Sequence, residues 1–333
     1  SQGLPLARDA LAMAETLGID ELRAHSLATI GLAKSYLGDP TGAQDEMHAL
    51  EIAMAANSPV AGSIANNVAV QAIFEFDLRR SDELFEEGER IAERFGDASG
   101  VRWLRGQRAI GAVILGHWDD ALGMIEEFIA ECEAGLPHYL EGSLRRERGR
   151  IREARGDIDA ALEDHRNAVA LGRSAGDPRE LVPNLSAAIA AFEAHGYMDD
   201  ARTLARELVD VARQSPHDAA ISASFDFVLT RVVRDYETEL RDALRDSPQP
   251  RWKELALTCL DRDFVRAAEM WAAGGSPTWE ARLRMRAAEE LIETGRRAEG
   301  EVELGQALAF YRSVKATFYV DRCAALLGQA KTA

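Results

Sequence analysis

The sequence has few of the residues that build disulfide-stapled, metal-binding or membrane-spanning proteins. Its 333 residues include only three cysteines, which lie far apart, without a CxxC pair and without a histidine at metal-ligand spacing. This arrangement excludes a disulfide framework and a zinc site and favours small, buried cysteine side chains. No apolar run approaches the roughly 18 residues of a membrane-spanning helix, and the N-terminus has no basic segment followed by an apolar one. We therefore expect a cytoplasmic protein without a membrane partner.

Proline, aromatic residues and positive charge are also scarce. The chain has 10 prolines and 7% aromatic residues, and its 56 acidic side chains outnumber 39 basic ones, which gives a net charge of −17. Such a charge repels nucleic acids and anionic membranes, so neither is expected as the main partner. Alanine and leucine, in contrast, are abundant within a hydrophobic content of 47%. Both are strong helix formers, and the composition therefore predicts an all-α protein.

The motifs of common enzymes are missing as well. There is no GxxxxGK(S/T) phosphate loop, no GxGxxG after a strand, no HExxH and no GxSxG. The acidic pairs at 119–120 and 199–200 recur at one place in a repeated pattern, which indicates helix caps instead of general acids. We expect no catalytic residue, no metal ligand and no cofactor in this chain. The scattered histidines are each expected to face solvent or a turn: His25, His48, His117, His138, His165, His195 and His217.

A six-residue pattern recurs along the chain. The segment GDIDAA at 156–161 has close relatives GDPTGA at Gly38, GHWDDA at Gly116 and GYMDDA at Gly196. Self-similarity at this period is typical of a helical repeat array. It predicts a right-handed α-solenoid of antiparallel helix hairpins, with repeats of about 37–41 residues. Weaker relatives are RRSDEL at Arg79, RDFVRA at Arg262 and GRRAEG at Gly295.

Each part of the pattern has a structural role. The glycine supplies a left-handed C-cap to one helix, and the aspartate after it caps the next, which makes a tight hairpin. Small residues recur seven positions before the glycine and five positions after it, as at Gly149 and Ala161. Two antiparallel helices approach closely only where side chains are small. These two residues are therefore expected to face each other.

The same signals predict one domain and its helices. We expect a single repeat domain at 1–333, with a degenerate repeat at 217–250 that Pro248 and Pro250 end, and with C-terminal repeats and a capping helix at 251–333. Prolines tolerated in the first helical turn help to set the helix starts. Helices are predicted near 4–17, 21–37, 41–56, 60–78, 81–95, 99–115, 118–134, 138–155, 158–174, 179–195, 198–214, 217–245 with a break, 251–261, 263–273, 278–294, 297–314 and 316–330.

These repeats resemble the tetratricopeptide repeat, whose first helix carries a small residue before a glycine turn and whose second opens with a hydrophobic residue and an alanine. The resemblance covers nearly the whole chain, although the repeats exceed the family's length of about 34 residues and mostly lack its closing proline. Residues 6–20 look like the second helix of a hairpin whose first helix is missing, so the chain is expected to be part of a longer array.

The C-terminal third carries a second resemblance. Residues 267–327, above all ALAFYRSVKATFYV at 307–320, resemble the end of bacterial proteins that combine a class III adenylyl cyclase domain, a switch ATPase and a helical repeat tail. The resemblance implies a regulatory role for this chain. It also implies that any cyclase or ATPase activity lies in domains outside it.

The tetratricopeptide resemblance implies a concave groove lined by the first helices of the hairpins. Trp103 stands at a position that faces this groove in such arrays. Alignment on Gly149 places Arg146 and Arg150 on the groove-facing side of their helix, whereas the equivalent positions elsewhere are mostly apolar. The apolar part of the groove is expected to include Ile73, Phe76 and Ile110.

Six of the twelve residues from Leu144 to Arg155 are arginine, and two interpretations of them stay open. Neighbouring helices supply carboxylates at 125–133 and 157–164, which favours internal ion pairs. Alternatively, Arg146 and Arg150 bind a carboxylate of a partner bidentately. Both interpretations hold together if the outer arginines pair internally and these two serve the partner.

The favoured function is a non-catalytic scaffold that binds a protein or peptide, one that carries a carboxylate, in the concave groove. In this hypothesis the chain is the regulatory or sensor region of a larger bacterial signalling or transcription-regulating protein. A free-standing adaptor with the same groove is the second hypothesis. The third is a receptor for a small molecule or signal peptide bound inside the superhelix, and an enzyme is the fourth. The sequence leaves the oligomeric state open.

Overall fold

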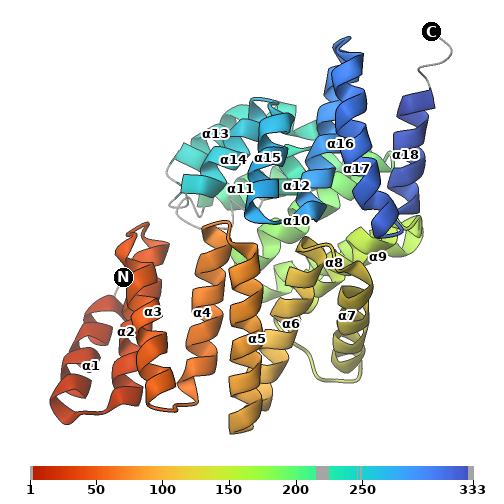
Figure 1. The fold of residues 1–333 in the computed structure, drawn as a ribbon. Coiled ribbons are helices and arrows are strands. Elements are labelled where there is room, and N and C mark those ends of the chain that lie inside the picture. The colour runs from red at the N-terminus through yellow and green to blue at the C-terminus, as the bar shows by residue number, and fades with distance from the viewer. Residues whose placement is uncertain (1–2, 215–224, 246, 248–249, 329–333) are drawn as a thin grey trace. The chain divides into compact units, whose positions relative to one another are not determined.

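A computed structural model describes residues 3–214, 225–245, 247 and 250–328 of the chain. Within these ranges the chain consists of helices joined by short turns and contains no strand, as Figure 1 shows. The prediction of an all-α solenoid of antiparallel helical hairpins is confirmed. The helices group into two compact units, residues 1–108 (unit 1) and 109–333 (unit 2).

Unit 1 is a stack of hairpins in chain order. Consecutive helices from α1 to α5 pack against each other, and α2 also packs against α4. The core that holds them is rich in alanine and leucine, together with Ile64, Val68 and Phe85. Alanine at the contacts lets the helix axes approach closely, which is why so few aromatic residues suffice. The helices are α1 (Gly3–Leu17), α2 (Asp20–Tyr36), α3 (Thr41–Ala55), α4 (Val60–Phe74), α5 (Leu78–Phe95) and α6 (Ala98–Ile114), whose last residues belong to unit 2.

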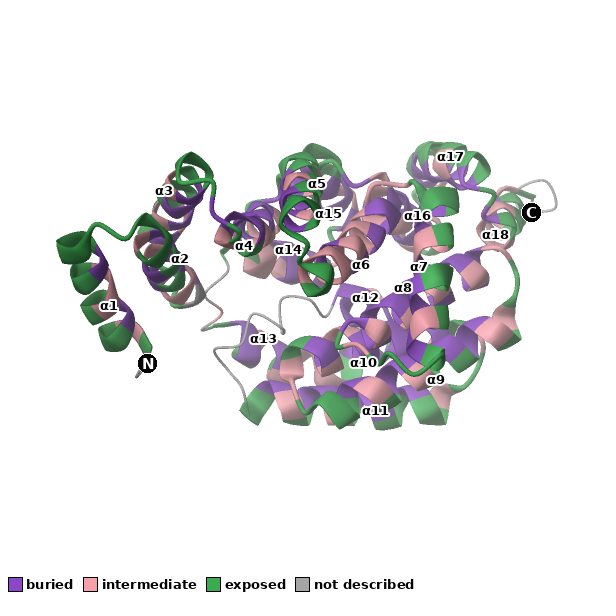
Figure 2. Ribbon diagram, turned by 90° about the horizontal axis from the view of Figure 1, so that it is seen from below, coloured by how far each residue is buried: buried purple, intermediate pink, exposed green. Residues whose placement is uncertain are grey.

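Unit 2 continues the pattern of consecutive hairpins. Its buried residues are most frequent on α8, α10, α12 and α16, and Figure 2 shows much of this burial on α8, α10 and α12. The helices are α7 (Trp118–Glu133), α8 (Glu141–Ala154), α9 (Ile158–Ala175), α10 (Pro178–Ala194), α11 (Met198–Gln214), α12 (Phe225–Val228), the 3₁₀ helix η2 (Val232–Tyr236), α13 (Glu237–Arg245), α14 (Pro250–Leu260), α15 (Phe264–Gly274), α16 (Pro277–Glu293), α17 (Arg297–Ser313) and α18 (Thr317–Gly328).

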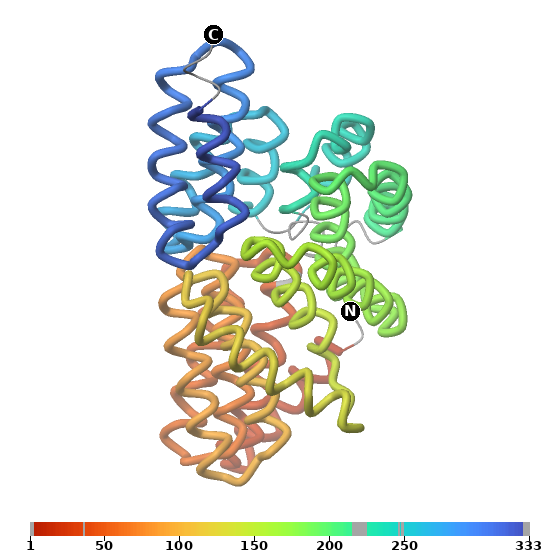
Figure 3. The backbone as a smooth tube through the Cα atoms, turned by 90° about the vertical axis from the view of Figure 1, so that its right-hand side faces the viewer, coloured from red at the N-terminus to blue at the C-terminus, as the bar shows by residue number. Residues whose placement is uncertain are grey.

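The last helices of unit 2 return to its first ones. Helices α16, α17 and α18, the blue segments of Figure 3, run side by side, and α18 packs against α8. At the start of α16 the hydroxyl of Thr278 donates to the carbonyl of Val113 at 2.6 Å and accepts from the indole N–H of Trp118 at 3.1 Å. At the start of α18 the hydroxyl of Thr317 donates to the carbonyl of Arg155 at 3.1 Å. The array in unit 2 is therefore closed on itself.

The predicted turns carry the expected backbone conformation, with one correction. Left-handed residues end the first helix of successive hairpins at Gly38, Gly116, Gly156 and Gly196. In the second hairpin this place belongs to Phe76, at φ 62°, and not to Arg79. The sequence pattern did not locate this turn, because glycine normally occupies the left-handed conformation and an aromatic residue occupies it here. The helices on either side consequently end at Phe74 and begin at Leu78, instead of the predicted 78 and 81.

Close approach at the predicted small residues is confirmed. A Cβ atom placed on Gly149 would lie 3.2 Å from the carbonyl oxygen of Ala161 and 3.1 Å from the Nε2 atom of His165. In the first hairpin the approach is closer still, since a Cβ atom on Gly31 would lie 2.7 Å from the carbonyl oxygen of Gly42. The recurring small residues therefore mark where α2 meets α3 and where α8 meets α9.

The degenerate repeat at 217–250 is a set of short helices where the structure describes it. The predicted helix at 217–245 is replaced by α12, η2 and α13, and its first eight residues lie outside the described ranges. Pro250 opens α14 instead of ending the repeat, because proline has the backbone angle of a first helical turn and no N–H to leave unpaired. Pro248 lies outside the described residues.

Candidate functional site

Unit 1 contains a groove along its first helices. A cavity of about 530 Å³ is bordered by α2, α4 and α6, the first helices of three successive hairpins. Its walls are mainly apolar and include Ala28, Leu32 and Leu104. Ala28 and Leu32 are four residues apart and therefore lie on the same face of α2. A surface of this kind excludes water from any extended ligand that lies across the three helices.

Polar side chains of the groove form a short hydrogen-bonded row. The indole N–H of Trp103 donates to the side-chain oxygen of Asn66 at 3.0 Å, and the amide of Asn66 lies 3.4 Å from the side-chain oxygen of Asn67. All three side chains line the groove and are half-buried. Amide side chains both donate and accept hydrogen bonds, as a peptide backbone does. The predicted groove position of Trp103 agrees with this geometry.

The other apolar residues predicted for the groove lie elsewhere. Ile73 is half-buried and packs against the core of unit 1. Phe76 is 8% exposed and occupies the turn between α4 and α5, so its expected place on the groove wall is corrected. Ile110 lies on the part of α6 that belongs to unit 2 and is half-buried. None of the three borders the groove in the described part of the chain.

The five arginines of α8 and Arg155, which directly follows it, are all paired with carboxylates of unit 2. The internal interpretation of the cluster is therefore confirmed. The pairs join Arg145 to Glu133 and Glu141, Arg146 to Glu147, Arg148 and Arg152 to Asp164, Arg150 to Glu147 and Asp226, and Arg155 to Asp119.

Arg146 does not face an open groove, which corrects the expectation that it is left for a partner. Its side chain is 9% exposed and donates to Glu147 at 2.9 Å, to Ser143 at 3.2 Å and to Asn184 at 2.9 Å. A guanidinium group buried in this way needs its internal partners, because a buried charge without hydrogen bonds is costly. Arg146 thus fastens α8 to α10.

Arg150 does reach a cavity, but with its charge already balanced. It donates to Asp226, and its guanidinium carbon lies 4.9 Å from the ring centre of Trp279. Arg282 approaches the same two residues, pairing with Asp226 and lying 5.1 Å from the Trp279 ring centre. Burial would raise the pKa of Asp226, yet the two guanidinium groups hold it below the ordinary range. One carboxylate therefore serves two arginines from α8 and α16.

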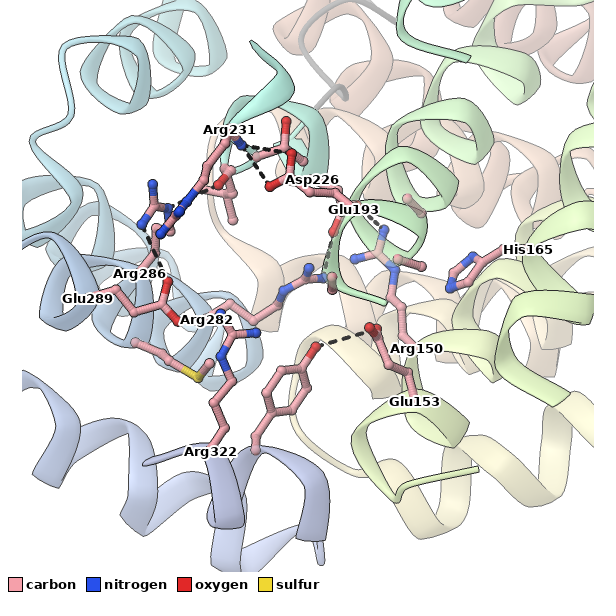
Figure 4. Close-up of a pocket in the computed structure, with 18 of the residues that line it drawn as sticks. Arg150, Glu153, His165, Glu193, Asp226, Arg231, Arg282, Arg286, Glu289 and Arg322 are labelled. Atoms are coloured by element: carbon pink, nitrogen blue, oxygen red, sulfur yellow. Dashed lines mark hydrogen bonds and ion pairs between the residues drawn. The ribbon is translucent and has the colours of Figure 1, made fainter. Parts of the chain in front are cut away.

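This cavity, shown in Figure 4, is lined by five arginines and four carboxylates. Its volume is about 450 Å³, within the usual range for small-molecule sites. Figure 4 shows arginines on several sides of it, with His165 on the side away from Arg286. The charged side chains that line it are Arg150, Arg231, Arg282, Arg286 and Arg322, and Glu153, Glu193, Asp226 and Glu289.

The cavity has a buried floor and an exposed rim. His165 and Tyr311 are each 1% exposed, whereas the side chains of Arg231 and Arg322 are 61% and 40% exposed. Burial lowers the pKa of His165 to about 4, so the imidazole is neutral at pH 7. The expectation that every histidine faces solvent or a turn is therefore wrong for His165. The sequence alone does not distinguish it, because its burial comes from α8 and from helices distant in the chain.

Glu153 shows how the cavity wall is assembled from distant segments. Its carboxylate lies 2.9 Å from the Nε2 atom of His195 and accepts from the hydroxyl of Tyr319 at 3.4 Å. Burial opposes its ionisation, but the hydrogen bond with His195 and nearby positive charge lower its pKa overall. Tyr319 stacks on Tyr311, with ring centres 4.8 Å apart. Both tyrosines come from the segment ALAFYRSVKATFYV, which the sequence analysis singled out, as it did Arg150 on the same wall.

The fold and these two cavities define an all-α helical-repeat protein. No group of three or more His, Cys, Asp or Glu residues in the described ranges is placed to hold a metal ion. Nor does any helix described by the structure have the length and apolar character needed to cross a membrane.

Comparison with known proteins adds little to this class. No protein-family model and no curated protein matches the sequence. Among solved structures, a "Circular tandem repeat protein with novel repeat topology and enhanced subunit contact surfaces" is 14% identical over 99% of this chain and 91% of that chain, with a TM-score of 0.25. A likeness at this level carries no argument about fold or function.

Proposed function

We propose that the chain is a non-catalytic scaffold that binds a protein or peptide along the groove of unit 1. The observation that supports this most directly is the row of Trp103, Asn66 and Asn67 on an otherwise apolar surface. An extended peptide would pair its backbone with the two amides and place an apolar side chain against the indole. Tryptophan in a desolvated pocket commonly dominates binding energy.

The groove favours an uncharged segment over one that carries a carboxylate. The acidic residue of its wall, Asp97, already caps α6 by accepting from the backbone N–H of Gly100 at 2.9 Å. Arg146 and Arg150, the basis for expecting a carboxylate, are paired within unit 2. A regulatory role within a larger signalling protein is part of the same proposal, and it rests on the resemblance of residues 267–327 alone.

The experiment is selection of peptides from a displayed library on the full chain, followed by calorimetry with the selected peptide. We expect Trp103→Ala to weaken binding at least tenfold, because it removes the indole and frees Asn66 from its donor. Phe95→Ala is the matched control, since Phe95 is a partly exposed aromatic residue of unit 1 that does not line the groove. Equal loss in both variants, or no peptide tighter than about 100 µM, would overturn the proposal.

A further inference from the structure

The carboxylates that line the cavity of unit 2 are already engaged. Each of the four accepts hydrogen bonds or ion pairs from at least two donors of the protein. Asp226 has Arg150 and Arg282, Glu153 has His195 and Tyr319, Glu193 has the backbone N–H groups of Arg231 and Val232, and Glu289 has Arg286 and Arg322. The walls consequently have little acceptor capacity left for a cationic ligand.

Donors, in contrast, remain unused. The Nη2 group of Arg286 makes no hydrogen bond within the described residues, and the Glu290 carboxylate is 3.8 Å away, beyond hydrogen-bond distance. Arg286 is only 8% exposed, and burial lowers its pKa because the charged form is poorly solvated there. The hydroxyl of Tyr311, 1% exposed, likewise has no partner in the part of the chain that the structure describes. Buried donors of this kind normally have a partner.

The imidazole of His165 adds a neutral polar contact at the floor. Neither of its ring nitrogens has a hydrogen-bond partner among the described residues. In the neutral form one nitrogen donates and the other accepts. This suits an uncharged hydroxyl or amide on a ligand better than a second charge.

An apolar strip faces the same space. It consists of small and flexible side chains, mainly on α10, and leaves room for a hydrophobic body. Its members are Ala187, Ala190, Ala191, Ala194, Met198 and Leu229. The cavity therefore combines buried unused donors, one of them cationic, with an apolar wall.

We propose that the cavity of unit 2 binds a small organic oxyanion, a carboxylate or a phosphate monoester, with its anionic group on Arg286 and its apolar body along the alanine strip of α10. Tyr311 and His165 supply further hydrogen bonds. The Nε and Nη1 groups of Arg286 already donate to the carbonyl of Leu229 and to Glu289, so Nη2 is the donor that is left for an oxygen of the ligand. A hydrogen bond from this cationic group to an oxyanion is charge-assisted. This site is separate from the groove proposed for peptides and stands on different residues.

The test is calorimetric titration of the full chain with matched pairs of ligands: hexanoate against hexanamide, benzoate against benzamide, and phenyl phosphate against phenol. We expect at least one anion to bind tenfold or more tightly than its neutral partner, and the tighter of the two anion types identifies the ligand chemistry. If no anion binds below 1 mM, or each binds no better than its neutral partner, the proposal is overturned.

Variants assign the site. Arg286→Gln should weaken anion binding at least tenfold and Arg286→Lys should restore part of it, whereas the exposed Arg312→Gln on α17 should bind as the wild type does. Ala190→Trp fills the apolar strip without altering a charge and should abolish binding. If Arg286→Gln does not fold, Ala190→Trp still tests the site. Unchanged affinity of the anion for Ala190→Trp would contradict binding in this cavity.

Discussion

At the residue scale, the interior of this protein handles buried charge in two different ways. In unit 2, the carboxylate of Asp226 lies between two guanidinium groups, which hold its pKa below the ordinary range despite burial. In unit 1, the carboxylate of Glu46 has no such cation among the described residues. It is 0% exposed, and one of its oxygens accepts only long bonds from Ser35 at 3.3 Å and Gln71 at 3.4 Å. A buried carboxylate with neutral partners favours its protonated form.

Glu46 should therefore make unit 1 less stable as the pH rises. Burial raises the pKa of Glu46 from 4.5 to about 7. Between these two pH values the folded state holds a proton on Glu46 that the unfolded chain has lost. Stability from this group is present below pH 4.5 and is lost as the pH rises through 7. Glu46→Gln removes the dependence and should be about 2 kcal/mol more stable than the wild type at pH 8, with little difference at pH 5.

Urea denaturation at pH 5, 6.5 and 8 measures this effect. Glu51→Gln, which changes an exposed carboxylate on the same helix, is the control and should not diverge from the wild type with pH. A constant difference between Glu46→Gln and the wild type at all three pH values would show that the carboxylate is ionised throughout.

At the scale of the helical element, contacts between small residues set how closely two helices pack. In the hairpin of α16 and α17, a Cβ atom on Gly300 would lie 2.8 Å from the Cγ1 atom of Ile292 and 3.1 Å from the carbonyl oxygen of Ala288. Gly305, on the same helix, has no atom within 4 Å of such a position. The two glycines differ in surroundings and not in helix context.

Alanine substitutions at these glycines should consequently act in opposite directions. Gly300→Ala forces α17 away from α16 and should cost about 1–3 kcal/mol of unfolding free energy. Gly305→Ala meets nothing and should stabilise the helix by up to about 1 kcal/mol, because alanine loses less backbone entropy. Thermal and urea unfolding of both variants distinguishes the cases. Stabilisation by Gly300→Ala would mean that the hairpin is looser than the glycine spacing indicates.

The elements could be predicted from the sequence to a large extent, because turn chemistry is local. Gly156 and the Gly149–Ala161 pair determine their hairpin through residues only a few positions apart. The prediction failed where a residue other than glycine adopts the left-handed conformation of a turn, as Phe76 does. The helix ends beside Phe76 were therefore predicted at the wrong residues. Pattern matching recognises the residue type and not the backbone angle.

The candidate site could be predicted far less well, because its residues come together from distant segments. The helix face on which Arg150 lies follows from its position next to Gly149 in the repeat. Its partner Asp226, however, is 76 residues away, and Arg282 comes from a still later helix. No local pattern marks such a triad. Trp103 is the exception, since its groove is built from three successive repeats and the repeat spacing brings them together.

At the scale of the whole molecule, closure gives unit 2 a property that an open array lacks. In an open solenoid each repeat touches only its neighbours, so the ends fray independently of the centre. In unit 2 the start of α16 is bonded to the end of α6 and to Trp118 at the start of α7, through Thr278 and through Ser276, whose hydroxyl donates to the carbonyl of Ile114 at 2.8 Å. Opening this seam should loosen segments far apart in the sequence together.

Thr278→Val tests this coupling, because it keeps the side-chain shape and removes the hydroxyl that accepts from Trp118 and donates to Val113. We expect a loss of roughly 1–2 kcal/mol and faster amide hydrogen exchange in both α7 and α16. Thr203→Val, which removes only a local bond to the carbonyl of Asp199 within α11, is the control and should affect α11 alone. If Thr278→Val speeds exchange in α16 but leaves α7 unchanged, the two ends of unit 2 open separately and the closed array is not one cooperative unit.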